Sequence, residues 1–267
     1  MSHRCAGGGA GAIAAALRRL PPAAGVADHL PWRLQCLPVC ASTELELDQR
    51  LARGLRPPLA VIARRQNRGH GQQGRVWQSP LGGVWLSAAL PWGAAGQNAR
   101  LAAPALALTL GLCLQLESLG LRPQIKWPND LLLQGRKVAG ILPRLRWRGE
   151  QLLGCRVGVG LNGVNRVPPG AIALVDALAK RGRLATAHPH HPASCPAPLA
   201  ALVLRGLEWA VAASCQPELV RRQAEQRLWR PDGYPHQGES WQVIGLQEDG
   251  GLRLKCGARL VTLRRHF

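Results

Sequence analysis

Hydrophobic and polar positions become regular after about residue 40. Between Ser42 and Leu55 leucines recur at helical spacing behind hydroxyl residues that suit an N-cap. Residues 59–63 are an apolar run of strand length that leads into the glycine-rich segment 68–75, and 84–90 is a second such run. The pattern predicts a helix and then two strands joined by a glycine-rich loop.

The middle of the chain predicts a long helix and several paired strands. Leucines share one face of a predicted helix over 98–119, with Pro104 in its first turn and Gly120 at its end. Gln134-Gly135 is expected to turn a hairpin. The further strands are expected over 124–127, 131–133, 136–145 and 152–161. The sheet should therefore be mixed, or antiparallel in part.

The two ends of the chain differ in character. Residues 1–38 have little pattern and are broken by prolines, which predicts an irregular N-terminal extension with one short helix at most. Amphipathic helices are expected over 199–213 and 218–229, and short strands over 241–246, 252–255 and 259–263. We therefore expect an α+β fold with a main domain over 39–232 and a small β-barrel domain over 233–267.

Composition and charge narrow the function classes. The net charge is +19, from 34 basic and 15 acidic residues, but only four of the basic residues are lysines and the charge is spread along the chain. The basicity therefore indicates either nucleic-acid binding, a background composition rich in Arg, Ala, Gly and Leu, or attraction to acidic proteins. No run approaches the roughly 20 apolar residues of a membrane span, and the N-terminal stretch does not have the order of a secretion signal.

The cysteines and histidines do not predict a metal centre. Eight cysteines stand at wide, irregular spacings without a CxxC pair, which favours reduced thiols in the cytoplasm. The proline-broken segment 180–198 contains His188, His190 and His191 and is expected to be a surface loop with solvated side chains.

Three segments carry polar residues that a core does not need. In the first, Gly69, Gly71 and Gly74 let backbone amides approach an anionic ligand, and Arg75 adds a fixed positive charge. The loop is followed by Trp77 and not by a helix, which argues against a dinucleotide-binding turn. A plain surface loop remains an alternative for this segment taken alone.

The second segment is KWPND at 126–130, which presents a lysine, an amide and a carboxylate at a rigid turn. A surface ion pair is one interpretation, and a carboxylate that helps to hold Mg²⁺ beside phosphates is the other. The third is RKVAGIL at 136–142, where Lys137 is a compact donor suited to a phosphoryl group. The small pair Ala139-Gly140 would let a ligand lie against this strand.

Together these strings resemble the biotin-protein ligases. The glycine-rich loop with its Trp and Ser-Pro, KWPND, RKVAGIL and GVGLN at 158–162 occur in that family's order and spacing, over about residues 40–263. The resemblance implies a class-II-synthetase-like mixed β-sheet flanked by helices, with a small C-terminal SH3-like β-barrel. The resemblance implies the monofunctional type of ligase, because the residues before Ser42 are too few to form a winged-helix DNA-binding domain.

The resemblance also implies chemistry and partners. Biotin and ATP, with Mg²⁺, would give biotinyl-5′-adenylate and pyrophosphate, and the biotinyl group would pass to a lysine of the biotin carboxyl carrier protein of acetyl-CoA carboxylase. To biotin it assigns Ser42, Thr43, Glu44, Gln66, His70, Gly71, Gln72, Lys137 and Gly140. To ATP it assigns Gly69, Gly74, Arg75, Trp77, Asn129, Asp130 and Asn162, with Lys137 and Arg75 catalytic and Mg²⁺ near Asp130.

Two departures from the family's pattern leave alternatives open. The family loop usually reads GRGRRGR, whereas residues 69–75 read GHGQQGR, and Glu44 stands where Asn or Gln is common. Arg68 is the candidate to replace part of the missing charge. The alternatives are a lipoate- or octanoate-transferring relative, a protein that holds biotin without catalysis, and a basic nucleic-acid-binding module. We expect no specific DNA site and no membrane association, and the sequence leaves the oligomeric state open, a homodimer included.

Overall fold

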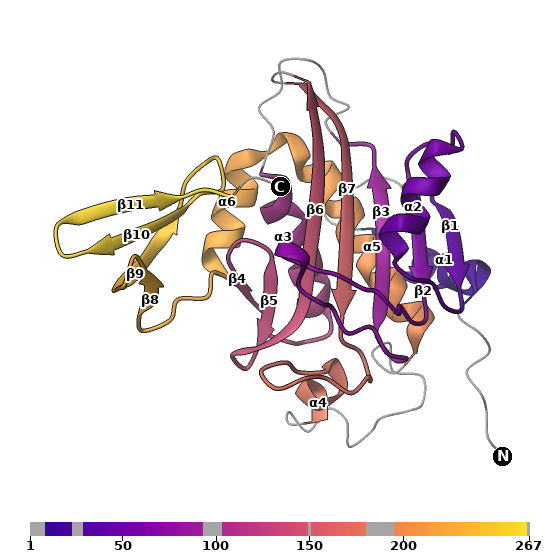
Figure 1. Ribbon diagram of the computed structural model, residues 1–267, viewed down its shortest axis with the longest axis horizontal. Helices are drawn as coiled ribbons and strands as arrows, with labels where there is room; N and C mark the ends of the chain where they lie inside the picture. Colours follow the sequence, from indigo (N-terminus) through magenta and orange to yellow (C-terminus); the bar gives the residue numbers. More distant parts are fainter. Residues whose placement is uncertain (1–8, 23–28, 93–102, 149–150, 180–194, 266–267) are drawn as a thin grey trace.

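The chain is built around a mixed sheet of seven strands in the order β1-β2-β3-β7-β6-β5-β4 (Figure 1). The computed structural model describes residues 9–22, 29–92, 103–148, 151–179 and 195–265. The strands are β1 (Arg33–Leu37), β2 (Leu59–Ala63), β3 (Val84–Leu90), β4 (Gln124–Lys126), β5 (Asp130–Leu133), β6 (Arg136–Arg148) and β7 (Gln151–Leu161). Only β1 and β2 run parallel, so the expected α+β class with a mixed sheet is confirmed.

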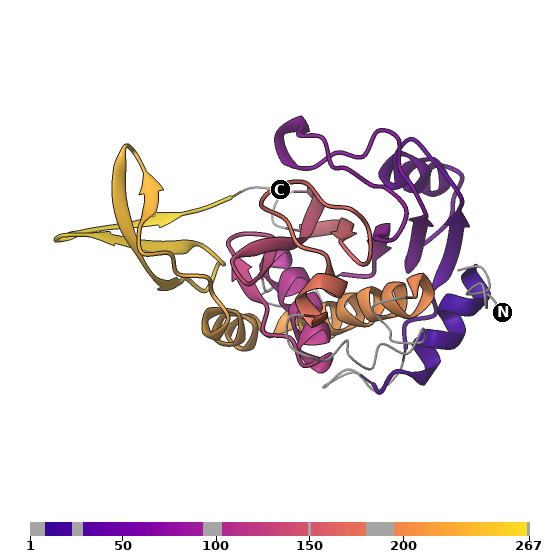
Figure 2. The ribbon, with the colours of Figure 1, turned by 90° about the horizontal axis from the view of Figure 1, so that it is seen from below.

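Helices cover the two faces of this sheet unequally (Figure 2). On one face lie α1, α3 and α5, and on the other lie α2 and the glycine-rich loop. The helices are α1 (Ala10–Arg19), α2 (Thr43–Ala52), α3 (Pro104–Ser118), α4 (Leu174–Ala179), α5 (Pro196–Ala212) and α6 (Pro217–Gln226), with the 3₁₀ turns η1 (Gln72–Gly74) and η3 (Ala213–Cys215). The thinly covered face is the one that leaves room for a ligand.

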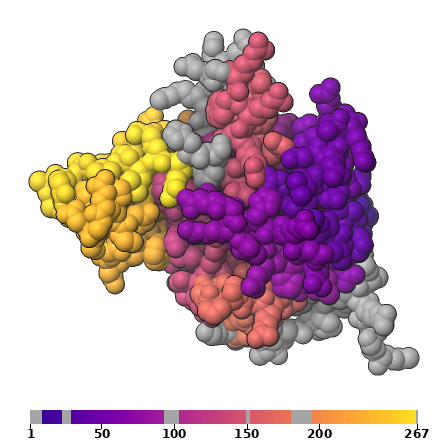
Figure 3. Space-filling view, viewed as in Figure 1, coloured from indigo at the N-terminus to yellow at the C-terminus, as the bar shows by residue number. Residues whose placement is uncertain are grey.

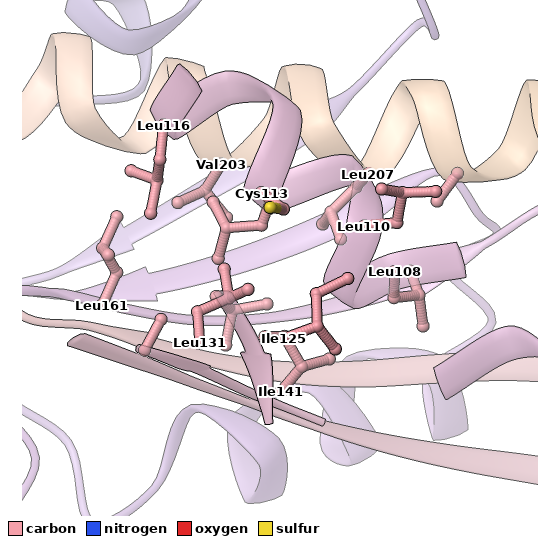
Figure 4. Close-up of a cluster of buried hydrophobic side chains, with 14 of the residues drawn as sticks. Leu108, Leu110, Cys113, Leu116, Ile125, Leu131, Ile141, Leu161, Val203 and Leu207 are labelled. Carbon is pink, nitrogen blue, oxygen red and sulfur yellow. The ribbon is translucent and has the colours of Figure 1, made fainter. Parts of the chain in front are cut away.

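The core lies between the sheet and the pair α3 and α5 (Figure 4). Both helices and the sheet contribute to the core. Examples are Leu108 of α3, Val203 of α5 and Ile141 of β6, all of which are buried. The helices cross where Gly111 meets Gly206, since a Cβ atom on Gly111 would lie 2.1 Å from the Gly206 carbonyl oxygen. This close packing gives the strands beneath the site a rigid support.

The segment 196–215 is more apolar than the sequence analysis allowed. By length and composition its 20 residues could cross a bilayer, so the statement that no run approaches such a span is wrong. In the fold, 78% of its most apolar window is buried against the sheet and its neighbours. A long, mostly apolar helix can also form part of the core of a protein, and α5 lies in the core.

The N-terminal residues are more ordered than the irregular extension predicted for 1–38. The helix α1 packs Ile13 and Leu17 into the core, and β1 adds a parallel edge strand to β2. Edge strand β1 alternates exposed and half-buried residues, a weaker hydrophobic pattern than that of a central strand, which explains why it was missed. The prolines at 21, 22 and 31 separate these elements without interrupting them.

A buried ion pair ties this N-terminal part to α5. The guanidinium of Arg205 and the carboxylate of Glu208 lie 2.6 Å apart, and both side chains are almost fully buried. The backbone N–H of Leu30 and the indole N–H of Trp32 donate to Glu208, and Arg205 donates to the Leu20 carbonyl. The N-terminal segment therefore supplies hydrogen bonds that the buried charges need.

The C-terminal part is a separate four-stranded antiparallel sheet in the order β11-β10-β9-β8. Its strands are β8 (Tyr234–His236), β9 (Glu239–Leu246), β10 (Leu252–Cys256) and β11 (Arg259–Leu263). The three predicted strands are confirmed, and β8, only three residues long and containing Pro235, was not predicted. Among the described residues the ladders run from β8 to β11, and none joins the two outer strands.

Most other predicted elements are present. Ser42 caps α2, accepting a hydrogen bond from the Glu44 amide at 3.3 Å, and Gln134-Gly135 turns the β5–β6 hairpin with φ of 54° and 72°. The part of the predicted helix over 98–102 lies outside the described residues, as does most of the histidine-containing segment, over 180–194. The short helix α4 was not predicted.

Candidate active site

A cavity of about 630 Å³ lies on the sheet face that carries α2. Its walls come from the first turn of α2, the loop 66–78, the strands β3, β6 and β7, and residues 168–171. In Figure 3 the loop lies across the front of the molecule over the strands β6 and β7. The volume is that of a site for a small molecule or cofactor.

The predicted site residues gather around this cavity from distant parts of the chain. It is lined by Ser42, Thr43, Glu44, Gln66, His70, Gly71, Gln72, Arg75, Trp77, Asn129, Asp130, Lys137, Gly140 and Asn162. Gly69 and Gly74 are the predicted residues that do not line it.

These two glycines shape the loop instead. A Cβ atom on Gly69 would lie 2.6 Å from the Trp77 carbonyl oxygen, so only glycine fits beneath the returning strand of the loop. Gly74 has a φ of 71° and follows Gln73, whose φ is 56°, so the two residues make a left-handed turn at the loop tip. The amide of Trp77 then donates to the Gly69 carbonyl at 2.9 Å and closes the loop as a hairpin.

One end of the cavity carries a chain of uncharged hydrogen-bonding groups. The Thr43 hydroxyl lies 2.8 Å from that of Ser87 and donates to the Gln66 carbonyl oxygen at 3.0 Å. The Gln66 amide group donates to the Ser79 hydroxyl at 2.8 Å. Ser42, Thr43 and Ser87 are buried. Such a set of donors and acceptors suits a neutral polar head group.

The indole of Trp77 lies on two strands that present no side chain to it. A Cβ atom on Gly160 would lie 2.4 Å from this ring, and one on Gly140 would lie 3.0 Å from it. The Trp77 indole N–H is buried without a hydrogen-bond partner. Gly140 and Gly160 face each other across β6 and β7, so this small-residue patch is what lets an aromatic ring lie flat against the sheet.

Lys137 is the cation nearest to that ring. Its ammonium nitrogen lies 5.0 Å from the Trp77 ring centroid and 2.6 Å from an Asp130 carboxylate oxygen. The backbone of Lys137 pairs with residues 170 and 172, which places its side chain at the rim of the cavity. About a third of this side chain is exposed, so an anionic ligand can reach it.

Two asparagines hold the turns beside Lys137. The Asn129 side chain donates to the Ile141 carbonyl, and the Ile141 amide donates back to the Asn129 carbonyl at 2.9 Å, which fixes the KWPND turn against β6. The Asn162 side-chain oxygen accepts from Asn165 at 3.1 Å. The NH₂ group of Asn162 makes no hydrogen bond to any described residue and remains a donor for a ligand.

The charged groups at the cavity mouth are arranged differently from the expectation. Arg75 lines the cavity and makes no ion pair within the described part of the chain. Arg68, the expected substitute for the missing loop arginines, is exposed and does not line it. Instead the carboxylate of Glu44 lies 2.7 Å from His70 Nε2 and pairs with Arg144 of β6.

The sequence analysis gave no site role to several of the lining residues. They are Val76, Gln78, Leu86, Ser87, Ile141, Leu142, Gly158, Val159, Gly160, Pro168, Pro169 and Ala171. Ser87 had a usable signal, because it is a lone polar residue in an otherwise apolar strand. Gly158 and Gly160 had one too, since glycines two apart leave one face of a strand bare. Arg144 had none, because an exposed arginine late in a strand looks like any surface charge.

Metal-binding groups are sparse in the described ranges. No cluster of three or more His, Cys, Asp or Glu side chains occurs there. Asp130 is a carboxylate at the cavity, and Mg²⁺ bound to nucleotide phosphates needs only one or two protein carboxylates. The residues therefore fit a Mg²⁺ ion that arrives with a nucleotide, not a resident metal.

Part of the chain matches the model of a known protein family. Residues 37–162, which include all of the loop, KWPND and RKVAGIL, match the model of the biotin/lipoate A/B protein ligase family. The match covers a little under half of the chain. The matched segment contains β2 to β7, α2 and α3, so it includes six of the seven strands of the main sheet and most of the residues that line the cavity.

Curated relatives match up to half of the chain. The chain is 39% identical over 142 residues to the biotin–[acetyl-CoA-carboxylase] ligase of Paracoccus denitrificans, covering 50% of this chain and 58% of that protein. It is 36% identical over 113 residues to the bifunctional ligase/repressor BirA of Bacillus subtilis, covering 40% of this chain and 33% of that protein. The match thus spans less than two thirds of these relatives.

Solved structures share the fold over almost the whole chain. The biotin protein ligase of Aquifex aeolicus, solved with biotin and ATP, aligns with a TM-score of 0.63 at 23% identity, over 88% of this chain and 95% of that one. The biotin protein ligase of Leishmania major, solved with biotinyl-5-AMP, aligns with a TM-score of 0.58 at 18% identity, over 88% of this chain and 100% of that one. The chain therefore shares the overall fold of these structures.

Proposed function

We propose that the protein is an ATP-dependent ligase that activates biotin as biotinyl-5′-adenylate and transfers it to a carrier-protein lysine. The observation that carries the proposal is the single cavity that brings together a neutral polar end, the Trp77 ring on its glycine patch, and Lys137. The biotin ureido group is neutral and has both donors and acceptors, which matches the end built from Thr43, Gln66 and Ser87.

In the proposed first step the biotin carboxylate attacks the α-phosphorus of ATP. A bond forms between a biotin carboxylate oxygen and the α-phosphorus. The bond from the α-phosphorus to the oxygen that bridges it to the β-phosphorus breaks, and pyrophosphate leaves with the electron pair. Two anions must approach each other, so a cation between them lowers the barrier. Lys137, at the cavity rim beside Trp77, is the proposed cation, and Arg75 is the proposed second one.

In the proposed second step a neutral lysine amine of the carrier attacks the acyl carbon of the adenylate. An amide bond forms, the bond from that carbon to the phosphate oxygen breaks, AMP leaves with the electron pair, and the nitrogen loses one proton to solvent. The loop 69–75 is proposed to keep water from the anhydride until the carrier arrives. Ser42, Gly71, Gln72 and Gly140 are proposed to line the biotin side.

The nucleotide is proposed to lie over the remaining part of the cavity. Trp77 would meet the adenine, with Asn129, Asp130 and Asn162 on the nucleotide side. Asp130 is the residue that would hold Mg²⁺, which neutralises phosphate charge when it is bound. The same carboxylate pairs with Lys137 and so orients its ammonium group at the rim of the cavity.

The proposed partner is an acidic biotin carboxyl carrier protein, which the net charge of +19 would attract. The proposed compartment is the cytoplasm, where reduced thiols are the rule. This agrees with the free thiols of Cys36, Cys40, Cys113, Cys155, Cys215 and Cys256. The division into an extension over 1–38, a catalytic domain over 39–232 and an SH3-like C-terminal domain over 233–267 remains part of the proposal.

Pyrophosphate release tests the proposal and separates it from its rivals. With Mg²⁺ and ATP, biotin is expected to trigger release, whereas lipoate and octanoate are not. Release with lipoate or octanoate alone would assign the protein to the lipoate side of the family. Binding of biotin by calorimetry without any release would show a binding protein that has lost catalysis.

A further inference from the structure

Three polar side chains from three different elements meet at the mouth of the cavity. Glu44 comes from the first turn of α2, His70 from the glycine-rich loop and Arg144 from β6. The His70 Nε2 atom lies 2.7 Å from a Glu44 carboxylate oxygen and 3.4 Å from Arg144 Nη2. Arg144 pairs with the same carboxylate through Nε and Nη2, the latter at 3.3 Å. Glu44 is thus shared between the loop and the strand.

A second ion pair lies beside this cluster and makes a natural comparison. Asp48 stands one turn after Glu44 on α2 and pairs with Arg156 of β7. Arg144 and Arg156 are direct neighbours across the β6–β7 ladder. Both pairs therefore tie α2 to the same position in the sheet, but only the pair with Glu44 includes a loop residue.

The loop depends on this cluster for its attachment. Within residues 70–76 the amide of Gly71 donates to the Arg75 carbonyl at 2.7 Å, which holds the hairpin to itself. Among the described residues, His70 makes the one ion pair that joins this stretch to another element. The side chains of Gln72 and Gln73, at two of the family's arginine positions, carry no charge that could do so.

We propose that Glu44, His70 and Arg144 form a clasp that keeps the glycine-rich loop closed over the acyl-adenylate, with Arg144 as a positioning residue. Arg144 of β6 then acts on the loop through Glu44, whose carboxylate contacts both Arg144 and His70. This inference rests on the proposed ligase function. Because the clasp lies at the mouth of the cavity, it should slow the dissociation of a bound adenylate. It should not affect the recognition of biotin, because the neutral polar end of the cavity is formed by other residues.

The test compares Arg144→Gln with Arg156→Gln, which removes the neighbouring ion pair and leaves the loop contact intact. With adenylate formed in single turnover, Arg144→Gln is expected to speed its dissociation about fivefold, the effect of about 1 kcal/mol from a partly exposed network. Arg156→Gln is expected to leave the rate unchanged, Arg144→Lys to restore most of the slow release, and the KM for biotin to stay within about twofold.

A second measurement does not depend on catalysis. Hydrogen exchange of the amides in residues 70–77, followed by mass spectrometry on the protein without substrates, should rise in Arg144→Gln and not in Arg156→Gln. If the wild type forms no adenylate, the proposed ligase function fails and the exchange result still judges the clasp. Equal exchange and equal adenylate release in both variants and the wild type would overturn the clasp.

Discussion

At the scale of single residues, Lys137 is the side chain on which the proposed chemistry depends most. It touches both Asp130 and the face of Trp77, so it is held at the place where two anions would meet. Lys137→Ala is expected to lower the rate of adenylate formation by about 10²- to 10³-fold, as expected for loss of a preorganised charge, and to weaken biotin binding far less.

The control for this variant is Lys126→Ala, in the same motif region. Lys126 lies over the Trp229 ring, 5.5 Å from its centroid, and does not line the cavity. Single-turnover formation of the adenylate, with calorimetry for biotin, measures both variants. Normal adenylation in Lys137→Ala would remove this lysine from the site.

Gly160 makes a second prediction at this scale. A methyl group there would overlap the Trp77 indole, so Gly160→Ala must displace the ring that is proposed to meet the adenine. The KM for ATP is expected to rise about tenfold or more. Gly154→Ala is the control, since a Cβ atom at Gly154 on the same strand has nothing within 4 Å. An unchanged KM for ATP in Gly160→Ala would contradict the role given to Trp77.

At the scale of elements, the N-terminal segment and α5 are joined by buried charges. Burial lowers the pKa of Arg205, and the nearby Glu208 carboxylate raises it. Each buried charge is therefore stabilised by the other. Glu208→Gln leaves a buried cation without its counter-charge and should lower the free energy of unfolding by about 3–5 kcal/mol in a urea titration.

Two comparisons make this result specific. Glu218→Gln removes a carboxylate from an exposed pair with Arg221 on α6 and should leave the free energy of unfolding nearly unchanged. The double variant Arg205→Met with Glu208→Leu should recover much of the loss, because neither charge is then buried. A loss below about 1 kcal/mol for Glu208→Gln would show that the N-terminal contacts do not bear on stability.

Some of the helices and strands could be predicted from the sequence pattern, and others could not. The helix after Ser42, the strands 59–63 and 84–90 and the Gln134-Gly135 hairpin were predictable, because caps, apolar runs and turn residues are local signals. β1, β8 and α4 were not, since each is short and is stabilised by its neighbours in space. The cavity's motif residues were found through the family resemblance, whereas the partnership of Glu44 and Arg144 exists only in the folded chain.

At the scale of the whole molecule, the fold protects several thiols. Burial raises the pKa of Cys40 to about 11 and that of Cys155 to about 12, and it raises the pKa of Cys113 further. Because the thiolate is the reactive form, these three cysteines should resist alkylation by iodoacetamide at pH 8 in the native protein and react once urea unfolds it. Peptide mass spectrometry reads each site. Rapid native labelling of Cys113 or Cys155 would show that the core opens readily.

The whole molecule also brings the neutral polar end, the Trp77 patch and Lys137 into one cavity between α2, the loop and the sheet. If this cavity activates biotin, its product must reach a carrier. The most direct measurement is the intact mass of a biotin carboxyl carrier domain after incubation with the protein, biotin, ATP and Mg²⁺. The account predicts a single biotin on one carrier lysine, absent without ATP and strongly reduced with Lys137→Ala. An unmodified carrier, with biotin and ATP both bound by the protein, would contradict it.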